Sequence, residues 1–190
     1  MKDRNINILQ AAQGVFARYG VSKTTMNDIA REAGVARQTL YNAYPSKEAV
    51  LRATLRLGAE NTIAAVEAKW RDQTNLSDKL DAFFELAPLY WYDVAQGSPH
   101  VADLIDGINA IAQDELTEIA KLWNAGFENV IHVHSQPGTT LHDNASDIAD
   151  FIYSTSMSAK YNAANRSTLE ARLSVLKVSI LALFDSSRNA

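Results

Sequence analysis

A group of polar side chains between residues 24 and 47 has the types that proteins use to hold double-stranded DNA. An arginine can donate two hydrogen bonds to a guanine edge, and glutamine or asparagine can pair in a similar way with adenine. The candidates for contacts in the major groove are Arg37, Gln38, Thr39 and Asn42. Hydroxyl and ammonium groups suit phosphates, which fix register without reading sequence. The candidates for phosphate contacts are Thr24, Thr25, Tyr41 and Lys47.

Two short helices joined by a tight turn would bring these side chains to one surface. Thr25 can cap the first helix, and Asp28 can complete a carboxylate variant of the capping box. Gly34 can adopt the left-handed conformation that ends this helix. A second helix over residues 36–43 would bury Leu40 and leave its polar side chains in solvent. The pattern therefore predicts a helix-turn-helix, whose second helix has the size that enters a major groove.

A second interpretation of the same residues is a corner in a helical bundle, because glycine-linked helix pairs with polar residues also occur there. The sequence on either side of the pair favours DNA binding. A helix over residues 4–19, ended by Gly20, would pack against the two helices of the motif and support them. Pro45 would then stop the second helix, and Ser46 would cap a fourth helix that continues to about residue 70.

Residues 8–51 resemble the N-terminal DNA-binding domain of the TetR family of transcriptional repressors, in the ordered segments ILQAAQGVFARYG, TTMNDIAREAGV and TLYNAYPSKEAVL. The resemblance implies an all-helical homodimer with a three-helix DNA-binding domain and a C-terminal domain that binds a small inducer and forms the dimer. It also implies phosphate roles for Thr25, Tyr41 and Lys47 and groove roles for Arg37, Gln38, Thr39 and Asn42. One departure is Ala36, which stands where a capping serine is common.

The length of the chain allows two small domains, and we expect all-α domains at residues 1–46 and 47–190. Residues 1–52 hold eight lysines and arginines against four acidic residues, whereas the rest of the chain holds ten against eighteen. A basic N-terminal region followed by an acidic remainder of the chain would attract DNA only at the N-terminal region. The sequence has no cysteine, no signal-type segment at its start and no apolar run long enough for a bilayer, so we expect a cytoplasmic protein.

A proline inside a helix suggests where the second domain could bind a small molecule. Residues 76–95 read as one helix with Pro88 in its interior, and a proline there removes a backbone donor and kinks the helix. Aromatic side chains cluster around this position and on the helix expected over residues 113–133. As single residues they could simply be core. As a group beside a kink, they are the predicted pocket lining: Phe84, Tyr90, Trp91, Trp123 and Phe127.

The last two helices, expected over residues 144–164 and 168–184, suggest self-association. The final helix carries apolar stripes on two opposed sides, so it needs two partners. One is its own domain and the other can be the same helices of a second chain, although burial of both sides within one subunit is an alternative. The predicted interface consists of Ile152, Thr155, Ala159, Leu173, Leu176, Ile180 and Leu183.

The interpretation that combines these features is a ligand-responsive homodimer that binds a palindromic DNA operator and is released by a small molecule. The alternative is an interaction protein with the same helix-turn-helix, controlled by a protein partner or by no ligand. The sequence contains no ordered nucleophile and base and no phosphate loop, so we expect no enzyme and no cofactor. His132, His134, His142 and Asp143 lie close in sequence, but their spacing suits exposed loop histidines better than a metal site.

Overall fold

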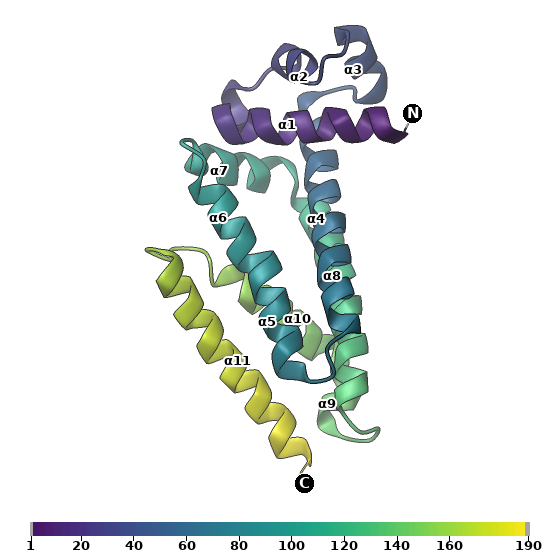
Figure 1. Ribbon diagram of the computed structural model, residues 1–190, viewed down its shortest axis with the longest axis vertical. Helices are drawn as coiled ribbons and strands as arrows, with labels where there is room; N and C mark the ends of the chain where they lie inside the picture. Colours follow the sequence, from purple (N-terminus) through teal and green to yellow (C-terminus); the bar gives the residue numbers. More distant parts are fainter. Residues whose placement is uncertain (1, 189–190) are drawn as a thin grey trace. The chain divides into compact units, whose positions relative to one another are not determined.

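The computed structural model describes residues 2–188, and every regular element in this range is a helix (Figure 1). The expected all-α fold is therefore confirmed. No helix in this part of the chain combines the length and apolar character needed to cross a bilayer.

The chain divides into two compact units that are not continuous in sequence. One unit combines the residues up to Asn61 with Val94–Thr117, and the other combines Thr62–Asp93 with the residues from Glu118 onward. This grouping differs from the expected segments 1–46 and 47–190. The physical reason is that α7 (Val101–Ile111) packs on α1 (Lys2–Lys23), although about eighty residues separate them.

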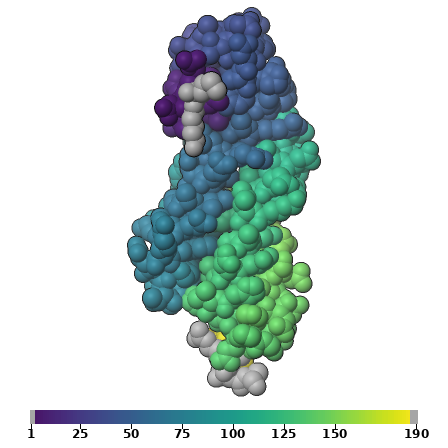
Figure 2. All heavy atoms as spheres, turned by 90° about the vertical axis from the view of Figure 1, so that its right-hand side faces the viewer, coloured from purple at the N-terminus to yellow at the C-terminus, as the bar shows by residue number. Residues whose placement is uncertain are grey.

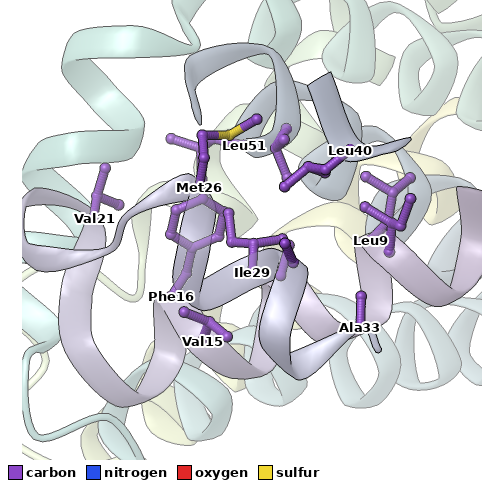
Figure 3. Close-up of a cluster of buried hydrophobic side chains, with 13 residues drawn as sticks. Leu9, Val15, Phe16, Val21, Met26, Ile29, Ala33, Leu40 and Leu51 are labelled. Carbon is purple, nitrogen blue, oxygen red and sulfur yellow. The ribbon is translucent and has the colours of Figure 1, made fainter. Parts of the chain in front are cut away.

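The first unit contains the helix-turn-helix. Its core is formed by buried side chains from successive helices, and Figure 3 shows them converging between the helices. These side chains include Ile8, Phe16, Ile29, Leu40 and Leu51. The helices that contribute them are α1, α2 (Met26–Glu32), α3 (Arg37–Ala43) and α4 (Lys47–Arg71). Gly20 has a φ of 78°, which ends the regular part of α1 at the predicted residue.

The second unit is a helical bundle around aromatic side chains. Its helices are the later turns of α4, α5 (Leu76–Phe84), the π-helical turn η1 (Glu85–Leu89), the first residues of α6 (Tyr90–Gln96), most of α8 (Gln113–His134), α9 (Thr140–Asp143), α10 (Ala145–Ser158) and α11 (Arg166–Arg188). Figure 2 shows the outer surface of α8 in green beside the blue later turns of α4. Trp70 of α4 and Phe127 of α8 join these helices, with ring centroids 5.1 Å apart.

Two local differences from the expected helices have identifiable causes. Pro88 lies in η1, so the predicted kink is a π-helical turn that accommodates the missing backbone donor. The helix expected to run to residue 164 ends at Ser158. The Arg172 guanidinium donates to the carbonyl oxygens of Ala159 at 2.8 Å and Tyr161 at 3.0 Å, which stabilises a turn in place of further helix.

Candidate nucleic-acid interface

The first helix of the motif begins at the predicted capping box. Thr25 accepts a hydrogen bond from the Asp28 backbone N–H at 3.2 Å, and the Asp28 carboxylate accepts one from the Thr25 backbone N–H at 3.1 Å. Bonds from Thr25 hold the pKa of the Asp28 carboxyl below its ordinary value. Because both ends of the box satisfy backbone donors that a helix start leaves free, α2 has a defined first turn.

The turn between α2 and α3 is fixed by glycine conformation and by α1. Gly34 has a φ of 64°, a region that other residues rarely adopt. The Val35 backbone N–H donates back to the carbonyl of Ala30 at 3.0 Å, and Asn7 of α1 donates to the carbonyl of Ala33 at 2.9 Å. These contacts set the angle at which α3 leaves the turn.

The recognition helix α3 is anchored by one side chain and presents the others. Leu40 is fully buried, whereas Arg37, Gln38 and Asn42 are exposed and Thr39 is partly exposed. The exposed residues pair along the helix. Gln38 Nε2 donates to Asn42 Oδ1 at 2.9 Å, and the Arg37 guanidinium lies 5.3 Å from the centroid of the Tyr41 ring. The helix therefore holds amide and guanidinium donors on a single exposed face, which is the arrangement needed to reach base edges.

The residues predicted to contact phosphates differ in how exposed they are. Thr25 is exposed and Tyr41 is partly exposed. Thr24 is only 2% exposed, and the hydroxyl predicted to contact a phosphate donates instead to the Gly20 carbonyl at 2.6 Å. Thr24 joins the end of α1 to α2 instead, because its hydroxyl satisfies a carbonyl that the helix end leaves free.

Lys47 has a structural contact that the sequence did not predict. Its ammonium donates to the carbonyl oxygens of Val21 at 2.7 Å and Ser22 at 3.3 Å. An ammonium has three donors, so these bonds leave one for a phosphate. Lys47 therefore ties the start of α4 to the end of α1 at the same place where a phosphate contact is predicted.

Sequence reasoning also missed α7 as a support for the motif. Asp103 of α7 accepts a hydrogen bond from the Ser22 backbone N–H at 3.0 Å, and bonds from Ser22 lower the pKa of its carboxyl. Gly107 lies so close to α1 that an added Cβ would stand 2.6 Å from Val21. Arg52 of α4 donates to the carbonyl of Ile111 at 2.8 Å, where α7 ends. The glycine in the helix was the only local signal for this packing.

The five residues predicted to line a pocket fall into two groups. Phe84, Trp123 and Phe127 are buried and meet through Phe83, whose ring centroid lies 5.8, 5.0 and 4.8 Å from theirs. Tyr90 and Trp91 instead contact each other, with centroids 5.2 Å apart, and Tyr90 is 46% exposed. Within residues 2–188 no ring contact joins the two groups. A π-helical turn holds about one residue more than an α-helical turn, so η1 rotates the following side chains by roughly 100°.

The predicted dimer residues lie mostly on the sides of their helices that face the subunit interior. Ile152, Leu173, Leu176 and Ile180 are buried within the subunit, Thr155 and Ala159 are partly buried, and Leu183 is exposed. The second apolar stripe of α11 is the one in solvent, with Val175 68% and Val178 66% exposed. The stripe with the larger side chains faces the subunit core because burying it removes more apolar area from water.

The histidines do not assemble into a metal site in the part of the chain that the structure describes. The rings of His132 and His142 lie 4.5 Å apart, and His142 Nδ1 lies 3.3 Å from the Ser135 hydroxyl. No group of three or more histidine, cysteine or acidic side chains among the described residues could hold a metal ion.

Comparisons with known proteins agree with the geometry of the first unit. Residues 8–54 match the family model described as "Bacterial regulatory proteins, tetR family". The chain is 22% identical over 125 residues to YezE, an uncharacterized HTH-type transcriptional regulator of Bacillus subtilis, covering 66% of this chain and 54% of that protein. It is 31% identical over 85 residues to YfiR, another uncharacterized regulator of this type from the same organism, covering 43% of this chain and 42% of that protein. The chain thus spans about half the length of these relatives.

A solved structure extends the similarity of fold beyond the helix-turn-helix. A transcriptional regulator from Rhodococcus sp. Rha1 matches with a TM-score of 0.71 at 18% identity, covering 94% of this chain and 96% of that chain. At this identity the match concerns the fold alone. Together with the capping box, the glycine turn and the exposed face of α3, the sequence match shows that residues 8–54 form a helix-turn-helix domain like that of the tetR family of bacterial regulatory proteins.

Proposed function

We propose that this protein is a homodimeric repressor that binds a palindromic DNA operator and is released from it by a small molecule. The observation that carries the proposal is α3, on which Leu40 is fully buried while Arg37, Gln38 and Asn42 stand in solvent. A helix anchored in this way can enter the major groove without losing its contact with the core. As a regulator of transcription, the protein would act in the cytoplasm and would carry out no catalysis.

The exposed stripe of α11 supports the homodimer. Val175 and Val178 form this stripe and are 68% and 66% exposed, Leu183 of the same helix is 47% exposed, and Phe151 of α10 is 47% exposed. Ser154 and Ser158 lie on the same exposed side of α10 as Phe151, and small residues allow close approach of a second helix. Two copies of such a surface can cover each other about a twofold axis, which would present two recognition helices to a palindrome.

The aromatic cluster of the second unit supports the effector site. Phe83, Phe84, Trp123 and Phe127 provide apolar contact area, and η1 beside them is a helix irregularity of the kind often found at functional sites. The helix α4 begins at Lys47 beside the motif and ends near Trp70, which contacts Phe127. A ligand that favours one position of α4 could therefore change the spacing of the recognition helices, by as much as its affinity differs between the two states.

Selection of binding sites from random double-stranded DNA would test the proposal. We expect an enriched palindrome whose half-sites lie about 10 base pairs apart, or a multiple of that distance, centre to centre. The matched control is the variant Arg37→Ala/Gln38→Ala, which keeps Leu40 and the fold but should enrich no sequence. Enrichment of a single, non-repeated half-site would contradict the dimeric arrangement, and enrichment of no site would contradict the function.

The effector part needs its own measurement, because an operator can be bound without any ligand control. Small molecules that raise the thermal unfolding temperature of the protein should be tested for release of the selected operator. A ligand that stabilises the protein and lowers operator affinity supports the repressor. If stabilising ligands leave operator affinity unchanged, regulation by a small molecule is contradicted, and control by a protein partner becomes the better interpretation.

A further inference from the structure

Lys160, in the turn between α10 and α11, is a cation without a protein counter-charge. The side chain is partly buried, and burial lowers the pKa of its ammonium from 10.5 to about 8. Removing an ammonium from water is costly unless an acid pairs with it. The ion pairs among the described residues involve other cations, including Arg166 with Asp93 and Lys177 with Asp81. The ammonium of Lys160 lies 5.7 Å from the centroid of the Tyr161 ring.

A purely structural role for Lys160 is already filled by other residues. Lysines near a helix C-terminus often bind its free carbonyl groups. Here Arg172 of α11 donates to the carbonyl oxygens of Ala159 and Tyr161. The other end of the turn is held by Tyr92, whose hydroxyl donates to the carbonyl of Ala163 at 3.4 Å. The turn is therefore braced on both sides without a contribution from the Lys160 ammonium.

A second polar group is Tyr153 of α10, which shares Tyr161 with Lys160 as a neighbour. Burial and the nearby Tyr161 raise the pKa of Tyr153 to about 12, so its phenol is a neutral hydrogen-bond donor. No hydrogen bond to another described residue engages its hydroxyl. Its ring stacks on Trp123 with centroids 6.1 Å apart, and Trp123 contacts Phe83 at 5.0 Å. Tyr153 thus connects the aromatic cluster to the region of the ammonium.

We propose that Lys160 and Tyr153 bind the anionic group of an amphiphilic effector, whose apolar part lies against the aromatic cluster around Trp123. This inference rests on the proposed function and specifies the chemical class of the ligand. A carboxylate, sulfonate or phosphate would supply the missing counter-charge to Lys160 and accept a hydrogen bond from the Tyr153 phenol. A charge-assisted contact at a desolvated site discriminates strongly against uncharged analogues, because they leave the ammonium unpaired.

Two fluorescent probes that differ chiefly in charge test this site directly. The anionic probe is 1-anilinonaphthalene-8-sulfonate, and the neutral probe is N-phenyl-1-naphthylamine, which has the same aromatic skeleton without the sulfonate. The full-length protein should bind the anionic probe more tightly. Lys160→Met should weaken binding of the anionic probe tenfold or more and leave binding of the neutral probe within about twofold. Tyr153→Phe should weaken binding of the anionic probe by a smaller factor than Lys160→Met does, and should leave binding of the neutral probe unchanged.

Matched variants separate this site from general charge effects. Lys121→Met makes the same charge change at an exposed ion pair with Glu118 and should not alter either affinity. Lys160→Arg retains the positive charge and should keep the preference for the sulfonate. The inference is overturned if Lys160→Met weakens binding of both probes equally or of neither. It is also overturned if Lys121→Met weakens binding of the anionic probe as much as Lys160→Met does. Because neither probe measurement involves DNA, failure of this inference and failure of operator binding can be told apart.

Discussion

The carboxylate of Asp103 in α7 accepts a hydrogen bond from the backbone N–H of Ser22, at the end of α1, over 3.0 Å. The contact lies beside Gly20, where an added Cβ would stand 2.1 Å from the Asp103 carboxylate oxygen. It also lies beside Lys47, which donates to the Ser22 carbonyl at 3.3 Å. One residue of α7 is therefore joined to the end of α1 at the point where the helix-turn-helix begins.

The first prediction concerns this contact and its dependence on pH. The folded protein holds the pKa of Asp103 below its ordinary value of 3.8, so the contact stabilises the fold fully above that value. The stabilisation is lost as pH falls through the lower pKa of the folded state. We expect Asp103→Ala to lower the free energy of unfolding at pH 7, and the difference from the parent to shrink below about pH 4. Urea unfolding of the parent and of Asp103→Ala at several pH values would measure this difference.

Asp106 provides the control for this prediction, because it is an exposed carboxylate on the same helix. Asp106→Ala should leave the unfolding free energy close to that of the parent at every pH. An Asp103→Ala variant as stable as Asp106→Ala at pH 7 would show that the α7 contact does not contribute to stability.

The second prediction concerns the uncapped start of the recognition helix. Ala36 has the extended backbone of an N-cap, with φ −65° and ψ 143°, but provides no side-chain hydrogen bond. The serine oxygen in Ala36→Ser should accept a hydrogen bond from a free backbone N–H and stabilise the protein by about 0.5 to 2 kcal/mol. Ala43→Ser, at the exposed end of the same helix, should give no comparable gain. Thermal unfolding of the two variants gives the comparison, and equal unfolding temperatures would contradict the capping argument.

The third prediction separates base reading from phosphate binding. Arg37→Ala should cost about 1 to 3 kcal/mol on the best operator and relax preference at one base position. Lys47→Met should weaken binding to all sequences alike and reduce the salt slope by about one. It should also lower stability, since Lys47 bonds two carbonyl groups of α1. Operator titrations at several salt concentrations would test both variants.

Arg71 supplies a control for the loss of one positive charge, because it is exposed at the end of α4. Arg71→Ala should bind the operator like the parent. If Arg37→Ala keeps both the parental affinity and the parental base preference at equal salt, Arg37 is not a groove residue.

The fourth prediction concerns the two stripes of α11. Val178→Glu places a charge on the exposed stripe, so we expect a folded monomer with much weaker operator binding. Ile180→Glu places the charge in the subunit core, where Ile180 is 1% exposed, so this variant should fail to fold. Sedimentation and circular dichroism distinguish these results. A Val178→Glu variant that remains dimeric would exclude the exposed stripe as the interface.

The fifth prediction concerns the stability cost of Lys160. Burial depresses its pKa from 10.5 to about 8, so the unfolded chain binds more protons between these values and stability rises with pH in this window. The penalty is fully present below about pH 8. Lys160→Met should therefore stabilise the protein at pH 7, on the order of 1 to 3 kcal/mol. The difference from the parent should shrink as pH approaches 10.5, and a destabilised variant at pH 7 would contradict the unpaired ammonium.

Local signals determined the DNA-binding elements. The capping box at Thr25 and Asp28, the glycine turn at Gly34 and the burial of Leu40 depend on residues within a few positions of one another. Such features are set by backbone geometry and nearby hydrogen bonds, so the sequence was sufficient to predict them.

Tertiary structure alone decided which surfaces are free. The sequence showed two apolar stripes on the last helix, but only packing placed Leu176 inside and Val178 outside. Thr24 became a buried contact and Lys47 a link to α1 because the end of α1 lies against them. Asp103 met Ser22 across eighty-one residues of sequence, and η1 turned Trp91 away from the face of Phe84. Periodicity identifies the apolar faces of a helix, whereas the partner that covers each face depends on contacts between distant segments, which no local pattern encodes.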